Sequence, residues 1–279
     1  MFAPKLITQT ITKKSLLAAA CSCLVASTVV LPLTLFAPSS QAQSRKVRYV
    51  PPSNVGAPRV SVPGATRSAG CEDGRCLIGL VPDLDAKVAP VPQTIAKRPT
   101  MYFLVPQIDG LGYFSLFETD PNLGKGKRIY RVSSFPVKVD RAGVIAFKLP
   151  DDAPALELNK NYIWEFKVAD FVDSNVVSGS IRRIAPTPKL ILQLPKLSSP
   201  VDRAALLAQE GVWFETVQTL ADALQLKQVE PDISNEWTSL LQSTKLDRVI
   251  SLPFTSITKP APKPESKPSS SPLTVPRYY

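Results

Sequence analysis

The sequence predicts an α+β protein in which an antiparallel β-sandwich precedes a small helical region, with extended arms at both ends. Short segments rich in aromatic and β-branched residues recur between residues 77 and 185, whereas apolar residues beyond Pro186 recur at helical spacing. The 28 prolines outnumber the 12 glycines more than twofold and gather near both ends of the chain that follows residue 42. Such a composition favours extended rather than packed structure in those arms.

The first 42 residues have the pattern of a secretory signal. Lys13 and Lys14 precede a 22-residue stretch without a charge, and Ser40-Gln41-Ala42 then offers a small-x-small cleavage site. We therefore expect the exported chain to begin at Gln43 and to reside in the periplasm or outside the cell. Because the uncharged stretch is almost long enough to cross a bilayer, an uncleaved anchor in the inner membrane is the alternative.

Six predicted strands show an alternation of buried and solvent-exposed positions. In the clearest of them, Tyr162, Trp164, Phe166 and Val168 share one face, while Glu165 and Lys167 lie on the other. Strands at intervals of roughly ten to twenty residues are typical of a two-sheet, immunoglobulin-like sandwich. The predicted strands are 101–105, 113–118, 128–132, 144–147, 162–168 and 176–181, with a hairpin loop over 120–128.

Helical spacing predicts two helices, 200–210 and 212–225, that meet at Gly211, and a third that begins at Pro231. The second of these resembles half of a tetratricopeptide-type hairpin, and such hairpins normally stack on a neighbouring unit. Trp213 and Phe214 are adjacent on it, and adjacent helical residues diverge by about 100°. We therefore expect one of the two to be partly exposed and to bind a helical partner or a second copy. The alternative is that both are core residues.

The segment boundaries predicted from these patterns are 1–42 for the signal, 43–70 for a linker with Pro and Arg, 71–185 for the sandwich, 186–253 for the helices and 254–279 for a disordered tail. After cleavage of the signal only Cys71 and Cys76 remain, on either side of a turn-like insert that contains Gly74. In an oxidising compartment we expect them to form a local disulfide, worth about 2 kcal/mol in the loop-entropy model. Two free thiols are the alternative.

The positive charge is concentrated in the arms. The chain has 33 Lys and Arg against 23 Asp and Glu, yet residues 71–250 hold 21 basic and 22 acidic residues. A nucleic-acid-binding domain would carry its basic excess on a folded face, so we expect no nucleic-acid partner. The basic arms are instead suited to acidic glycans, lipid head groups or a partner protein. The sequence does not predict the oligomeric state.

An ordered set of short motifs resembles a cyanobacterial secreted family known as domain of unknown function 928, over about residues 50–253. The motifs include Gly64-Ala65-Thr66-Arg67, Cys71, Tyr162-x-Trp164-x-Phe166, Gly211-x-Trp213-Phe214-Glu215 and Glu236-Trp237. Two positions depart from the family pattern, because Ala65 replaces a glycine and Asp170 stands where members place a cysteine. If that cysteine normally pairs with the leader cysteine, Cys76 is a local substitute here. The family has no established activity, so the resemblance implies compartment and lineage but no mechanism.

No catalytic motif emerges from the sequence. The absence of histidine excludes imidazole bases and His-bearing zinc and haem sites, and we predict neither a metal nor a cofactor. Gly124 to Lys127 lacks the spacing of a phosphate-binding loop. We therefore expect a non-catalytic interaction or adaptor module of the cell envelope. The alternative is a carboxylate-dependent hydrolase that acts on an envelope polysaccharide, with its carboxylate pair unassigned.

Overall fold

The computed structural model describes residues 47–53, 77–84, 90–120, 124–169, 174–226 and 232–256. All of them belong to one compact unit. The predicted signal, the cysteine pair and Asp170 lie outside the described residues, so those predictions are untested. No helix within the described ranges is long and apolar enough to cross a lipid bilayer.

Eight strands form two sheets. The five-stranded sheet has the order β2 (Gln93–Thr94), β8 (Ser174–Arg183), β7 (Asn161–Ala169), β4 (Ile108–Asp120) and β5 (Gly124–Val139). The three-stranded sheet has the order β1 (Ile78–Gly79), β3 (Thr100–Val105) and β6 (Gly143–Lys148). All six predicted strands are confirmed, and the structure adds the two-residue strands β1 and β2. The residues Gly124 to Lys127, predicted as loop, belong to β5, because β4 and β5 pair almost to their ends.

Aromatic rings from both sheets meet in the core. Phe103 of β3 stacks on Phe166 of β7 at a centroid distance of 4.2 Å, and Phe147 of β6 stacks on Phe114 of β4 at 4.5 Å. Trp164 packs directly over Gly79, where an added Cβ would come within 2.5 Å of the indole. The two sheets therefore pack face to face, as the alternation of side chains predicted.

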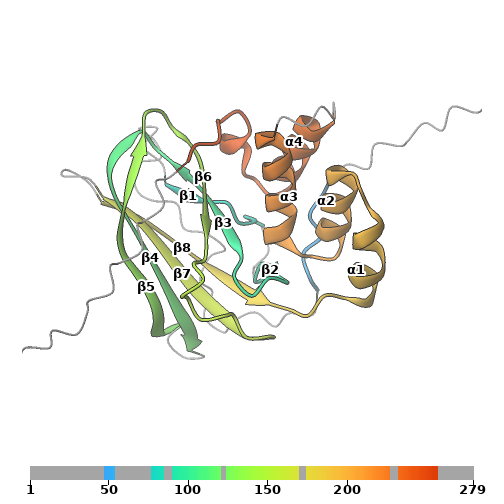
Figure 1. Cartoon of the computed structure of the whole chain (residues 1–279), viewed down its shortest axis with the longest axis horizontal. Helices are drawn as coiled ribbons and strands as arrows, with labels where there is room; N and C mark the ends of the chain where they lie inside the picture. Colours follow the sequence, from blue (N-terminus) through green and yellow to red (C-terminus); the bar gives the residue numbers. More distant parts are fainter. Residues whose placement is uncertain are drawn as a thin grey trace, which may run out of the picture. The chain divides into compact units, whose positions relative to one another are not determined.

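The helices cover the other face of the three-stranded sheet, so the fold has three layers (Figure 1). Every residue of β3 is buried, and on the helical side the Tyr102 hydroxyl bonds to the Asp222 carboxylate of α3. Burial raises the pKa of Tyr102, with a further contribution from Asp222. The α+β class with two sheets is thus confirmed. An immunoglobulin-like arrangement is not confirmed, and β2 pairs in parallel with β8.

The predicted helical region is present, with one addition. The helices are α1 (Pro188–Gln193), α2 (Pro200–Gln209), α3 (Trp213–Gln225) and α4 (Ile233–Ser243). Gly211 joins α2 to α3 with a φ of 73°, a conformation that glycine adopts without strain. Helix α1 was not predicted from the sequence. It begins after Thr187, whose side chain accepts a hydrogen bond from the Leu190 amide.

Residues 47–53, which we call the strap, correct the prediction of a free N-terminal arm. Val47 and Tyr49 are buried, and the Val47 amide donates to the carboxylate of Glu236 on α4. Tyr49 packs edge-on against Trp213 at 5.0 Å, and the Val50 amide donates to the Ala208 carbonyl at 3.0 Å. The strap is extended, as its prolines favour, but its alternate residues enter the core between helices.

The C-terminal boundary also shifts. Phe254, predicted as the first residue of the tail, extends the three-stranded sheet beside β6, because the Val144 amide donates to the Pro253 carbonyl and the Thr255 amide donates to the Val144 carbonyl, both at 2.8 Å. Its ring also contacts Trp237 at 5.5 Å. The folded unit therefore includes Phe254 and Thr255.

Candidate functional site

The face of the five-stranded sheet that points away from the three-stranded sheet is the candidate site. On β4 and β7 the core side chains alternate with Tyr113, Ser115 and Phe117, which face Lys167, Glu165 and Ile163 across the register. Because successive strand residues point to opposite faces, these side chains lie opposite the aromatic core. We call the set formed by Tyr113, Phe117, Lys125, Arg128, Arg131, Glu165 and Lys167 the outer sheet face.

Ammonium groups lie over aromatic rings on the outer sheet face. The Lys125 Nζ lies 4.8 Å from the centroid of the Phe117 ring and 2.5 Å from the Glu165 Oε1. The Lys167 Nζ lies 5.6 Å from the centroid of Tyr113. Contacts of this kind contribute about 0.5–1 kcal/mol at exposed sites. The half-buried ring of Tyr113 can also contact the apolar face of a sugar, whereas Phe117 is buried beneath Lys125.

The edge strand β5 adds a row of cations to this face. Residues 124–139 contain five Lys and Arg and no acidic residue. Lys138 pairs with Asp109 at 3.4 Å, and Lys127 interacts electrostatically with Glu118, whereas Arg128 and Arg131 form no ion pair within the described residues. Charges on an edge strand also prevent edge-to-edge association of sheets, which is their structural role without any ligand. The unpaired cations nevertheless make this the described surface best suited to an anion.

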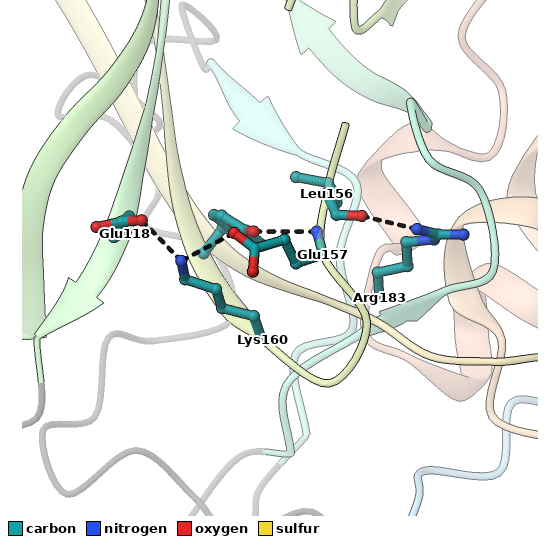
Figure 2. Close-up of polar contacts among 6 residues, drawn as sticks. Glu118, Leu156, Glu157, Lys160 and Arg183 are labelled. Carbon is teal, nitrogen blue, oxygen red and sulfur yellow. Dashed lines mark hydrogen bonds and ion pairs between the residues drawn. The ribbon is translucent and has the colours of Figure 1, made fainter. Parts of the chain in front are cut away.

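One end of the sheet carries two carboxylates that share a lysine (Figure 2). The Lys160 Nζ lies 2.7 Å from the Glu118 Oε1 and 3.1 Å from the Glu157 Oε1. The hydrogen bond from Lys160 lowers the pKa of Glu118. A general acid for glycoside hydrolysis needs a raised pKa, so Glu118 has the opposite electrostatic character.

Residues 156–160, the loop that carries Glu157 and Lys160, are held in place by hydrogen bonds of their backbone. Asn159 adopts a φ of 60°, and the Glu157 amide donates to the Tyr162 hydroxyl at 3.0 Å. The Arg183 Nη1 donates to the Leu156 carbonyl at 2.8 Å, a contact also drawn in Figure 2. These contacts attach the loop to β7 and β8. The ion pairs of Lys160 therefore have a structural role and need no ligand to account for them.

Glu215 in the first turn of α3 is an unusual carboxylate. Its Oε1 accepts hydrogen bonds from the Thr94 hydroxyl at 2.5 Å and from the amides of Ile95 and Ala96 at 3.2 and 3.0 Å. Its Oε2 is shielded from solvent and has no hydrogen-bond partner in the described part of the chain. Burial raises the pKa of Glu215, and the three hydrogen bonds oppose that shift. The group fastens the segment after β2 to α3.

This geometry gives a testable pH dependence. Because the pKa of Glu215 is higher in the native than in the unfolded state, its contribution to stability is full below the unfolded pKa and is lost as the pH rises through the native pKa. Glu215→Gln lacks this loss, so the unfolding free energy of the wild type relative to Glu215→Gln should fall as the pH rises above about 4, the ordinary pKa of a glutamate. Urea unfolding of both proteins measures it. Parallel pH profiles would contradict the assignment.

Trp213 and Phe214 are both buried, with exposed fractions of 0% and 3%. The expectation that one of them is partly exposed is therefore wrong, and neither presents a surface for a partner. The Trp213 Nε1 donates to the Leu80 carbonyl at 2.8 Å, and the strap residue Tyr49 covers the indole edge. Two adjacent aromatic side chains project over a wide arc of the helix surface. Strands cover one side of this arc, and the strap and neighbouring helices cover the other.

The other predictions from the sequence concern the cysteine pair and metal binding. Cys71 and Cys76 lie outside the described residues, so their disulfide stays a prediction. Among the described residues, no three Cys, Asp or Glu side chains form a group able to hold a metal ion. Glu165 and Lys167 were predicted from the sequence to face solvent, but neither β5 nor Glu215 was identified as part of a site. The run of cations without an acid in 124–139 is the signal that could have identified β5.

A family model described as Domain of Unknown Function (DUF928) matches residues 62–254. The chain belongs to this family. The DUF928 match contains both sheets and all four helices, whereas the strap precedes it. No curated protein and no solved structure matches the chain significantly.

Proposed function

We propose that the protein is a non-catalytic module of the cell envelope that binds an anionic polysaccharide on its outer sheet face. The observation that carries the proposal is the pair of exposed residues Arg128 and Arg131, which form no ion pair among the described residues and lie opposite Phe117 and Ser115 of β4. An extended anionic chain along β5 would supply the missing negative charge. Export of the protein, by the signal predicted in residues 1–42, is part of this proposal.

The geometry gives less support to a carboxylate hydrolase. Glu118 and Glu157, which share Lys160, are held as ionised partners of a cation. Glu215 has a raised pKa, but its carboxylate already accepts three hydrogen bonds and its Oε2 is closed to solvent. A substrate would have to displace the segment after β2 to reach it. Binding rather than hydrolysis therefore accounts better for the groups that are accessible.

Charge reversal on β5 tests the proposal. In the full chain, Arg128→Glu combined with Arg131→Glu should weaken binding to immobilised alginate by about tenfold or more, and the wild-type affinity should fall as salt is added. Neutral dextran should bind neither protein. Both arginines are exposed, so the variant should unfold at the same denaturant concentration as the wild type.

The matched control carries the same change in net charge elsewhere. Lys97 and Lys148 are exposed and lie outside β5, on the segment after β2 and on β6. Lys97→Glu combined with Lys148→Glu should leave alginate binding within about twofold of the wild type. An equal loss in both double variants would mean that total charge, or the basic arms, accounts for binding, and the outer sheet face would lose its role.

A further inference from the structure

The strand register sets the order of charged and uncharged groups across the outer sheet face. Arg131 of β5 lies opposite Ser115 of β4, which in turn lies opposite Glu165 of β7. In the neighbouring row, Tyr113 of β4 lies opposite Lys167 of β7, whose Nζ is 5.6 Å from the centroid of the Tyr113 ring. Between a cation on β5 and a cation on β7, β4 therefore presents a half-buried hydroxyl and a half-buried ring, both uncharged.

The two cations are separated by about the length of a disaccharide. The strands β5 and β7 lie on either side of β4, and Lys167 is displaced from Arg131 by two residues along the strands. With strands about 4.8 Å apart and a rise of about 3.4 Å per residue, their Cα atoms are roughly 12 Å apart. A polysaccharide that lies along β5 can therefore cross β4 from Arg131 to Lys167, with one sugar between these two contacts.

Glu165 makes the middle of this path unfavourable for another anion. Of the seven residues that define the outer sheet face, it alone is acidic. Its Oε1 accepts a hydrogen bond from Lys125, and 29% of its side chain is exposed. A carboxylate on the sugar over β4 would lie beside Glu165, and juxtaposed like charges oppose binding. An uncharged sugar in the same place can donate a hydroxyl hydrogen to Glu165 and rest its apolar face on Tyr113.

We propose that the outer sheet face selects a polysaccharide in which anionic and neutral sugars alternate, and that Glu165 determines this specificity. The inference rests on the proposed binding function and adds the order of the sugars to it. The anionic sugars contact Arg131 and Lys167, and the neutral sugar between them lies over Tyr113.

A comparison of two polymers tests the proposal on the full chain. Hyaluronan carries a carboxylate on every second sugar, whereas alginate carries one on every sugar. At equal carboxylate concentration and equal ionic strength, the wild type should bind hyaluronan about fivefold more tightly than alginate. Glu165→Gln removes the negative charge and keeps the shape of the side chain, so alginate binding should tighten and the affinity ratio should fall toward equality.

Asp109→Asn is the matched control. Asp109 pairs with Lys138 as Glu165 pairs with Lys125, so each substitution removes one negative charge and releases one lysine. Asp109 lies on β4 six residues before Ser115, which is roughly 20 Å along the strand. Asp109→Asn should therefore leave the ratio of the two affinities within about twofold of the wild type.

The outcomes separate this inference from the proposed function. Equal affinity of the wild type for both polymers, or the same change of the ratio in Glu165→Gln and Asp109→Asn, would overturn the alternating order of sugars. Loss of binding on charge reversal at Arg128 and Arg131 would still support the proposed function in that case. If the wild type bound neither polymer, both would be wrong.

Discussion

Replacement of Trp213 by alanine should cost about 4 kcal/mol of unfolding free energy, a large part of the stability of a small protein. The indole is fully buried, and its removal leaves a cavity between the first turn of α3, the strap and β1. It also leaves the Leu80 carbonyl without the donor that lies 2.8 Å away. Guanidinium unfolding followed by circular dichroism measures the loss.

A graded control separates the hydrogen bond from the packing. Trp213→Phe keeps an aromatic ring but removes the N–H, so it should cost about 1–3 kcal/mol, less than Trp213→Ala. Leu226→Ala, at an exposed position, should cost less than about 0.5 kcal/mol. If Trp213→Ala cost no more than the exposed control, Trp213 would be a surface residue and the structure of the first turn of α3 would be wrong.

Substitution of the buried strap residues should lower the unfolding free energy by a comparable amount, whereas substitutions in a free arm would hardly change it. Tyr49→Ala should lower the unfolding free energy by about 3 kcal/mol, because it removes a buried ring that packs on Trp213. Val47→Asp should be at least as severe, since it places a second carboxylate beside buried Glu236. The measurement is again denaturant unfolding of the full chain.

Arg48→Ala is the control within the strap. Arg48 lies between the two buried residues but points to solvent, so its replacement should change the unfolding free energy by less than about 0.5 kcal/mol. Equal and small effects at positions 47, 48 and 49 would mean that the strap is a free arm. If the strap is part of the fold, experiments that remove the basic N-terminal region must retain residues 47–53.

The longer strands and helices follow from the sequence because each of them carries its own periodicity, whereas the two-residue strands β1 and β2 and the short helix α1 are too short to show one. The alternation of Tyr162, Trp164 and Phe166 with Glu165 and Lys167 identified both faces of β7, and hence part of the outer sheet face. Gly211 marked the turn between α2 and α3, since few other residues adopt its positive φ without strain. Such signals lie within a few residues of the element they describe.

Tertiary structure alone decided which elements become core and which polar groups become buried. Val47 and Tyr49 lie in a segment whose arginines and prolines predict an extended arm. They are buried only because they contact residues at and after the start of α3 that lie more than 160 positions further along the chain. Tyr49 also covers Trp213, whose burial cannot be predicted from the helical spacing alone. Glu215 is an ordinary glutamate on an amphipathic helix until the segment after β2 closes over it. Local periodicity reports how one element divides its own faces, whereas burial depends on what the rest of the chain places against each face.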